Sequence, residues 1–470
     1  MKAGLLAAVT LYAGLLLAAG LLFPKKFRDL EAFFLASRRL GAARIAFSLC
    51  AGWVGAASLL VSTDQAFREG LSAYWIIGLP AVATLLVFLP LARAVRNMGG
   101  STLPDIMEAR YGPAARPATT VLVVWYMAVL AASQMVAAGR FLQAFLGLPF
   151  TASTALAGGL VVVLLAAGGF LSVIRAHTVQ FFLLMAGVAA LTVSLGLRSS
   201  WAAVTAQASR LGKTDYFDFL AHADRNVLIA LSFVLAWTIS PIAWQRIQAA
   251  RSERAARGGV AAAAVLLALF YAAIVRAGMQ FLPLFAGIPA ANPLVSEYIA
   301  RETGPLLGGL IFVTVLAAIL STMAAAVNSG AFLLARDFLR YGRREGAGQA
   351  TIVMGRVATL IVGAAAFLVA VRFEDILKTL GLASKIMAEG LLIPGLAAVL
   401  SRRRAPLAGL TSLVAGGAYA LLCFLAEAGA LPPSLPAWPH SLPTGLALSA
   451  GGFAVGLALD RLKSRRLPRP

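Results

Sequence analysis

The alternation of hydrophobic and polar residues divides the chain into thirteen apolar stretches joined by short polar segments. Each stretch can supply the roughly 20 residues that a helix needs to cross about 30 Å of hydrocarbon. Because backbone groups in lipid must be hydrogen-bonded within their own segment, the pattern predicts an all-α polytopic membrane protein with about 13 transmembrane helices. The predicted spans are 4–22, 45–63, 71–92, 117–146, 152–172, 178–197, 226–244, 258–286, 304–333, 351–371, 376–400, 406–427 and 443–460.

The loops between these stretches alternate between segments that are rich and poor in Lys and Arg. Most of the 40 Lys and Arg residues lie in the odd-numbered loops and the C-terminal tail. An excess of Lys and Arg marks the cytoplasmic loops of membrane proteins. The charge pattern therefore predicts an N-terminus outside the cell, a cytoplasmic C-terminus and a multi-pass location in the inner (plasma) membrane.

The composition agrees with a membrane protein, since 60% of the residues are hydrophobic and only 13% are charged. A net charge of +21 would indicate nucleic-acid binding in a soluble chain. Here the charge is spread over the loops, where topology and anionic lipids account for it, so we expect a lipid bilayer and no nucleic acid as partner. The chain contains no complete Gly-x-x-x-x-Gly-Lys-Ser/Thr phosphate-binding loop and no nucleophile–base pair, so we expect no enzyme activity and no catalytic residues.

Two of the predicted spans contain residues that interrupt a helix. Gly52, Gly55 and Ser58 lie in the middle of the second span, and Pro241, which removes a backbone donor, lies five spans later. A helix interrupted at mid-membrane exposes carbonyl and amide groups that can bind a cation or a carboxylate, and paired interruptions are typical of inverted-repeat transporters. Close helix packing explains the glycines equally well, so both interpretations stay open.

Several segments, in order along the chain, resemble the sodium:solute symporter family, which contains the proline, sugar and sialic acid symporters. The most specific match lies at 101–112, where Ser-Thr-Leu-Pro-Asp and Glu-Ala-Arg-Tyr-Gly are similar to the family's TLPDFLEARYG segment. The other matching segments are 33–38, 48–58, 168–180, 244–250 and 317–337.

The resemblance implies the leucine-transporter-like fold, in which two inverted five-helix repeats form a ten-helix core. The core would cover 44–401, with repeat one at 44–198 and repeat two at 225–401. An extra N-terminal helix and a cytoplasmic loop would precede it at 1–43, and two C-terminal helices and a basic cytoplasmic tail would follow at 402–470.

The resemblance also implies a sodium site, built from the oxygen ligands that hard cations prefer. In the family, two hydroxyls and a carbonyl of the eighth core helix join two carbonyls of the broken first core helix around one sodium ion. The matching residues here are Ser321, Thr322, Ala318, Ala51 and Val54. Without the resemblance, the two hydroxyls would be interpreted as bonding to carbonyls one turn earlier in their own helix.

One position departs from the family. The family has a Thr-Asp pair on the fifth core helix, and this chain has Ala176 and His177 at the same place. In relatives the acidic residue lies near the sodium exit path, and in some it completes a further sodium site, so the replacement argues against a second bound sodium ion. Histidine can titrate near neutral pH, which makes His177 a candidate for a proton-linked step. A hydrated side chain beside Arg175 is the alternative.

The resemblance places the solute near the middle of the membrane, between the two broken helices. Trp53 stands where the sugar and proline symporters have a polar gating residue, and the second core helix is apolar near Ile77, where the sugar symporters have an acidic ligand. The first departure argues against a sugar and against proline, and the second argues further against a sugar. The residues expected to line the site are Trp53, Gly55, Ser58, Gln134, Trp237 and Ser240.

Two ionisable residues of the tenth core helix are further candidates for coupling. Lys385 and Glu389 are four residues apart and share one helix face. Ionisable groups inside a span are costly and often functional. They can pair with each other, or Lys385 can face a solute carboxylate.

These features together predict a sodium-coupled symporter that imports a small organic solute, an amino acid or a carboxylate, by alternating access. A proton-coupled transporter that uses His177 and a solute sensor that does not transport are the alternatives. The sequence leaves the oligomeric state open, with a monomer as one option.

Overall fold

The computed structural model describes residues 7, 10–15, 18, 38–98, 102–287, 293–341, 348–400, 404–431 and 441–466. Most of the predicted first span at 4–22 and of the matching segment at 33–38 lies outside these residues. Within them the chain is helical apart from turns and one isolated backbone bridge between Leu40 and Ala250.

The helices follow the apolar stretches of the sequence. In chain order they are α3 (Ala42–Trp53), the π-helix η2 (Ala57–Val61), α4 (Ser62–Glu69), the 3-10 helix η3 (Gly70–Trp75), α5 (Gly78–Asn97), α6 (Leu103–Tyr111), α7 (Ala115–Leu146), α8 (Phe150–Arg198), α9 (Trp201–Arg210), α10 (Ala223–Thr238), α11 (Pro241–Gln248), α12 (Glu253–Gln280), α13 (Leu282–Phe285), α14 (Leu294–Glu302), α15 (Pro305–Tyr341), α16 (Gly348–Phe373), α17 (Ile376–Leu400), α18 (Pro406–Glu427) and α19 (Leu442–Arg466).

Among the described residues, nine helices are long and apolar enough to cross a membrane, or ten if the bent pair α10 and α11 forms one span. This establishes an all-helical, multi-pass membrane protein. The count of thirteen spans stays a prediction. The predicted spans 152–172 and 178–197 lie within the continuous helix α8, which contains separate apolar segments at Phe150–Gly168 and Val173–Arg198.

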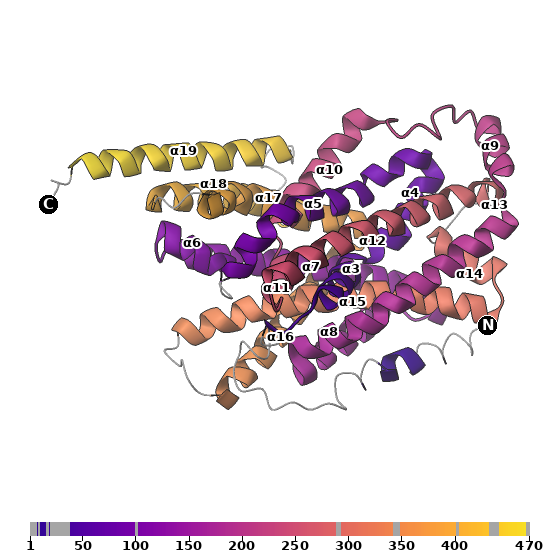
Figure 1. Ribbon diagram of the computed structural model, residues 1–470, viewed down its shortest axis with the longest axis horizontal. Coiled ribbons are helices and arrows are strands. Elements are labelled where there is room, and N and C mark those ends of the chain that lie inside the picture. The colour runs from indigo at the N-terminus through magenta and orange to yellow at the C-terminus, as the bar shows by residue number, and fades with distance from the viewer. Residues whose placement is uncertain are drawn as a thin grey trace.

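The long helices run roughly side by side along the longest axis of the molecule (Figure 1). The short helices α9, α13 and α14, which belong to segments poor in Lys and Arg, gather at the right-hand end of this view. The short helix α6 and the C-terminus lie at the opposite end. The segments poor in Lys and Arg therefore lie at one end of the bundle, and α6 and the C-terminus, which belong to segments rich in Lys and Arg, lie at the other.

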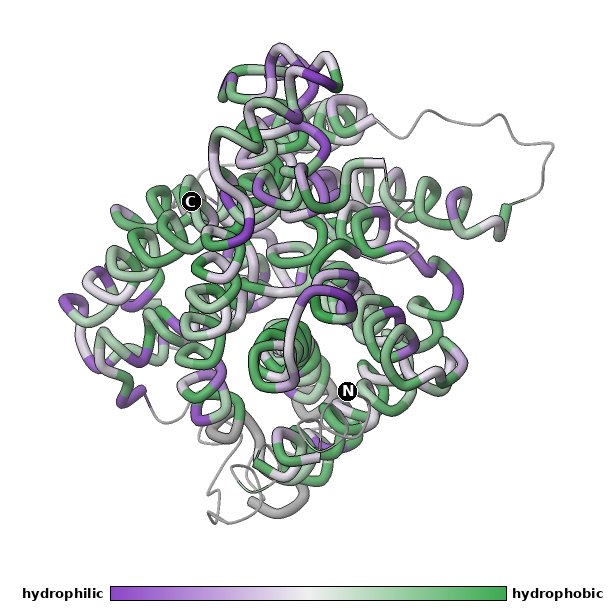
Figure 2. The backbone as a smooth tube through the Cα atoms, turned by 90° about the vertical axis from the view of Figure 1, so that its right-hand side faces the viewer, coloured by the Kyte–Doolittle hydropathy of each residue, from purple (hydrophilic) through white to green (hydrophobic). Residues whose placement is uncertain are grey.

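The two helices α7 and α15 form the centre of the bundle. In the most apolar segment of each helix, 83% of the residues of α7 and 89% of those of α15 are buried inside the protein. For α19 the buried share is 22%. In the end-on view of the backbone, hydrophobic residues make up much of the peripheral helices (Figure 2), as expected for helices that face lipid. Exposed hydrophobic residues include Val163, Phe182, Val193, Leu360, Leu368 and Val455.

The segment that matched the family most specifically forms α6 and ties it to the core. Thr102 and Asp105 form a reciprocal capping box at the start of this helix. The buried Arg116 at the start of α7 contacts Asp105 at 2.6 Å, Glu108 at 3.0 Å and Asp337 of α15 at 2.6 Å. This ionic cluster connects α6 with the central helices at the end of the bundle where the C-terminus lies.

Candidate functional site

The first helix of the core is interrupted where the sequence predicted. Helix α3 ends at Trp53, Val54 and Gly55 are not helical, and η2 begins at Ala57. The amide of Ala56, left without a helical partner, donates to Oε1 of Gln134 on α7 at 2.9 Å. Gln134 therefore stabilises the interruption through its side chain.

A second interruption separates α10 from α11. The two helices meet at 42°, and Pro241 is the first residue of α11. Proline suits this position because the first amide of a helix needs no partner. The indole nitrogen of Trp244 donates to the carbonyl of Thr238 at 3.0 Å and so satisfies one carbonyl at the end of α10.

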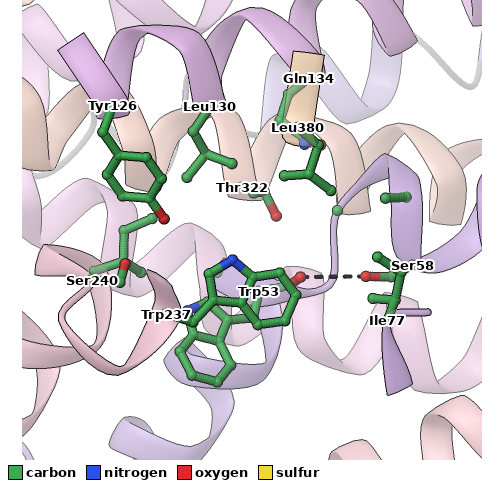
Figure 3. A pocket seen from close by; sticks show the side chains of 14 residues that line it. Trp53, Ser58, Ile77, Tyr126, Leu130, Gln134, Trp237, Ser240, Thr322 and Leu380 are labelled. Carbon is green, nitrogen blue, oxygen red and sulfur yellow. Dashed lines mark hydrogen bonds between the residues drawn. The ribbon is translucent and has the colours of Figure 1, made fainter. Parts of the chain in front are cut away.

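A cavity with about 450 Å³ of atom-free space lies between the two interruptions. Figure 3 shows the indoles of Trp53 and Trp237 on one side, with ring centroids 5.8 Å apart, and Thr322 on the opposite side. All six residues expected to line the solute site contribute to it. The complete lining is Gly52, Trp53, Gly55, Ala57, Ser58, Ile77, Tyr126, Leu130, Gln134, Trp237, Ser240, Ile242, Thr322 and Leu380.

Sequence reasoning did not name Tyr126, Leu130, Ile242 or Leu380 as lining residues. Each of them belongs to an apolar stretch in which no residue indicates which helix face lines a cavity. Tyr126 points its hydroxyl toward Ser240 in the cavity (Figure 3). Only the packing of α7 against its neighbours reveals this contact.

Gly55 lies where the first interruption approaches the central helices α7 and α15 closely. A Cβ atom at this position would lie 2.6 Å from Oε1 of Gln134 and 3.0 Å from Oγ1 of Thr322. Real Cβ atoms are not found at the first of these distances. The absence of a side chain at Gly55 therefore lets the interrupted backbone reach both Gln134 and Thr322.

The residues expected to bind sodium lie at this approach. Oγ of Ser321 donates to the carbonyl of Ala318 at 2.9 Å, the bond to the previous turn that the sequence alone suggested. Oγ1 of Thr322 is buried and has no hydrogen-bond partner among the described residues, although it lines the cavity. Ala51 and Val54 are fully buried at the end of α3. A buried hydroxyl without a partner is a ready ligand for a cation.

His177 is completely buried on α8 and contacts the same part of α15. Its Nε2 lies 3.1 Å from the carbonyl oxygen of Ser321, and its Nδ1 lies 3.1 Å from Oγ of Ser48 on α3. Arg246 of α11, also buried, donates from Nε to the same Ser48 hydroxyl at 2.9 Å. The alternative of a hydrated His177 is therefore wrong, because the surrounding helices exclude water from the ring.

Lys385 and Glu389 lie elsewhere on α17. Neither belongs to the lining of the cavity, which takes only Leu380 from this helix. Glu389 is completely buried, and its side chain lies against Gly445 of α19. The structure therefore places this residue at the contact with the C-terminal helices rather than beside the solute cavity.

A second cavity, with about 380 Å³ of atom-free space, adjoins the interruption between α10 and α11. Its lining extends along α15 from Ser329 to Leu333 and reaches Thr102 at the start of α6. The hydroxyl of Ser329 donates to Oε1 of Gln245 across it at 2.9 Å. The two cavities thus lie along the same central helix, and the second is the nearer to the ionic cluster.

The comparisons with known proteins agree with this geometry. Residues 33–416 match the sequence model of the sodium:solute symporter family. The sodium/proline symporter of Haemophilus influenzae is 24% identical over 391 residues, which are 77% of this chain and 76% of that protein. The human sodium/iodide cotransporter is 24% identical over 368 residues, which are 73% of this chain and 56% of that protein.

Solved structures show a shared fold. A sodium-coupled sialic acid symporter in a substrate-bound, outward-open state superposes with a TM-score of 0.80 at 15% identity, over 98% of this chain and 97% of that one. This chain therefore shares its overall helical fold with that symporter. The family match covers most of the chain, and the relatives are transporters. The chain belongs to the sodium:solute symporter family and is a membrane transporter rather than an enzyme.

Proposed function

We propose that the protein is a secondary active symporter that uses an inward sodium gradient to import a small organic solute by alternating access. The main support for this function is the position of Thr322. Its buried hydroxyl has no partner among the described residues and lines the central cavity. One residue of the predicted cation site thus lines the same cavity as the residues of the predicted solute site. Binding of the two can then be coupled directly.

In this proposal sodium is held by the carbonyl oxygens of Ala51, Val54 and Ala318 and by the hydroxyls of Ser321 and Thr322. The donor set suits a hard cation, because all five groups are oxygens. The carbonyl of Ala318 and the hydroxyl of Ser321 are 2.9 Å apart, close enough to contact one ion. A single sodium site is supported by His177, which offers no carboxylate to a second.

We further propose two inverted repeats, at 44–198 and 225–401. Each repeat begins with an interrupted helix. The packing is also equivalent: α3 contacts α12 as α10 contacts α5, and α8 contacts α15 as α17 contacts α7. The segments 1–43 and 402–470 would then flank the core, with the N-terminus outside and the C-terminus in the cytoplasm of a plasma-membrane protein.

Alternating access requires a path from the central cavity to each side of the membrane. The second cavity supports a cytoplasmic path, since it begins at the same interruption and extends toward α6. Ser240 and Ile242 line the first cavity, whereas Ile239 and Pro241 line the second. A change in the angle between α10 and α11 would therefore alter both cavities together.

Proton coupling through His177 is the runner-up. The ring contacts Ser321, which gives it a suitable position. The hydrogen bonds favour the neutral ring, however: a carbonyl accepts at Nε2, and the Ser48 hydroxyl can donate to Nδ1. A second positive charge would also be repelled by Arg246, which is bonded to the same hydroxyl.

The test is uptake into proteoliposomes that contain the purified protein. Radiolabelled candidate solutes are presented with an inward sodium gradient, with an inward proton gradient in choline, or with neither. The proposal expects accumulation only with the sodium gradient. Accumulation driven by the proton gradient alone supports the runner-up, and a solute that binds but never accumulates supports a sensor.

A further inference from the structure

The described residues that line the central cavity include no charged side chain. None of its fourteen described lining residues is Asp, Glu, Lys, Arg or His. The walls are formed largely by Trp53, Trp237, Leu130, Ile77 and Leu380. A solute in this cavity must therefore find its polar partners among hydroxyls, indoles and backbone groups, while its body contacts apolar walls.

The carbonyls of Trp53 and Trp237, one at each interruption, are already occupied. The carbonyl of Trp53 accepts from the amide of Gly55 at 3.0 Å and from the hydroxyl of Ser58 at 3.3 Å. The carbonyl of Trp237 accepts from the amides of Ile239 and Ser240. A carbonyl oxygen has two lone pairs, so each of these groups is saturated.

Two side-chain acceptors of the cavity, on Gln134 and Ser58, already have a partner. Oε1 of Gln134 accepts from the amide of Ala56, and the Ser58 hydroxyl pairs with that of Tyr271 at 2.7 Å. The ammonium group of an amino acid would bring three donors and a full positive charge. None of the described lining residues carries a carboxylate, the carbonyls of Trp53 and Trp237 are occupied, and those of Ala51 and Val54 are assigned to sodium in the proposed site. The cavity therefore offers this group little compensation for lost water.

Donors, in contrast, remain available. The indole nitrogen of Trp53 faces the part of the cavity where Tyr126 and Thr322 lie (Figure 3). An indole N–H can only donate. Thr322 places the proposed sodium ion at the same part of the cavity, because its hydroxyl is both a lining group and a proposed ligand. A solute group that accepts hydrogen bonds and carries negative charge meets both features there.

We propose that the solute is an organic monoanion, a monocarboxylate with a small apolar body. This inference rests on the proposed sodium-coupled transport. The carboxylate accepts from the Trp53 indole and lies beside the bound sodium ion, and the body packs against the Trp53 and Trp237 rings. An isolated anion in an uncharged cavity is costly, and the sodium ion provides the opposite charge. The need for that charge makes solute binding depend on sodium.

The test uses a matched series on the purified full chain. The probes are 3-methylbutanoate, L-valine and 2-methylpropylamine, which share one apolar body and differ in the carboxylate and ammonium groups, together with L-proline and D-glucose. Thermal unfolding is followed with each probe in sodium and in choline buffer. We expect only 3-methylbutanoate to raise the melting temperature, with an apparent affinity on the order of tenfold higher in sodium.

Trp53→Phe keeps the aromatic ring and removes the indole donor, so it should weaken 3-methylbutanoate binding on the order of tenfold. Stabilisation by sodium alone should be unchanged, which shows that the variant is folded. Trp75→Phe is the matched control, since its indole donates to the carbonyl of Phe219 outside the cavity at 2.9 Å. It should bind the carboxylate as the wild type does.

Stabilisation by L-valine, L-proline, D-glucose or the amine in place of the carboxylate would overturn the monoanion inference and leave sodium coupling intact. The same holds if sodium stabilises the protein but no carboxylate adds to it. If sodium itself has no effect on the wild type, the proposed function fails, and the inference fails with it.

Discussion

The imidazole Nε2 of His177 lies 3.1 Å from the backbone carbonyl oxygen of Ser321. Because a carbonyl only accepts, the ring must donate here, and its Nδ1 is then an acceptor for the Ser48 hydroxyl. Arg246 donates to that hydroxyl in turn. A continuous chain of donors and acceptors thus links α11, α3 and α8 to the helix that carries the proposed cation ligands.

This chain of hydrogen bonds predicts a difference between two substitutions of His177. His177→Gln keeps one donor and one acceptor and should retain sodium-dependent uptake. His177→Leu removes the ring's donor to the Ser321 carbonyl and its acceptor for the Ser48 hydroxyl in a buried place, which should raise the sodium concentration for half-maximal uptake on the order of tenfold. The measurement is initial uptake rate against sodium concentration in proteoliposomes.

The same pair of variants separates sodium coupling from proton coupling. If His177 positions Ser321 without exchanging a proton, uptake by His177→Gln should show the wild-type dependence on pH between 6 and 8. A flattened pH dependence in both variants would instead support a proton-linked step at this residue.

Gly55 should tolerate no side chain. A methyl group would lie 2.6 Å from Gln134 Oε1, so we expect Gly55→Ala to lower stability by about 1–3 kcal/mol and to abolish stabilisation by sodium. Gly159→Ala is the control, because a Cβ at that position meets nothing within 4 Å. Melting temperatures in sodium and choline report both effects. Equal behaviour of the two variants would show that the approach of the interruption to α7 and α15 is not needed.

The ionic cluster at α6 should make stability depend on pH in acid. Burial raises the pKa of Asp105, but Arg336 and the hydrogen bonds from Thr102 and Arg116 outweigh it, and the folded-state pKa lies below its ordinary value. A depressed pKa stabilises the fold above the unfolded-state pKa of about 3.9, and the contribution disappears as the pH falls through the folded-state value.

Asp105→Asn should therefore lower the melting temperature at pH 7 and remove part of its fall between pH 5 and 3. Arg116 keeps contacts to Glu108 and Asp337, so the loss should be about 1–3 kcal/mol. Glu374→Gln is the control, since its pair with Arg140 is exposed and should contribute less than about 1 kcal/mol. An equal effect of both substitutions would contradict a special role for the cluster.

The sequence predicted the apolar helices and both interruptions because each has a local signal: uniform hydropathy in the first case, and Gly55 or Pro241 in the second. It could not predict the chain of bonds around His177. Ser48 and Arg246 are 129 and 69 positions away along the sequence, and only the packing of α3, α8 and α11 brings them together.

Lys385 and Glu389 show a second limit. Their spacing indicates that they share a helix face but not the direction of that face. The structure turns Glu389 toward Gly445 of α19, a helix outside the predicted core. Tyr126 shows the opposite error, a functional position that the sequence does not reveal. It lies within a long apolar stretch without any local signal, yet it lines the cavity.

The central claim is that Ser321 and Thr322 bind the sodium ion that drives transport. Thermal unfolding of the purified protein in sodium and in choline tests it directly, with Ser321→Ala/Thr322→Ala beside the wild type. Thr359→Ala is the matched control, because its hydroxyl is also buried and bonds only to the carbonyl of Gly355 in its own helix at 2.8 Å. The proposal predicts that sodium raises the melting temperature of the wild type and the control but not of the double variant. Equal stabilisation of all three proteins would contradict it.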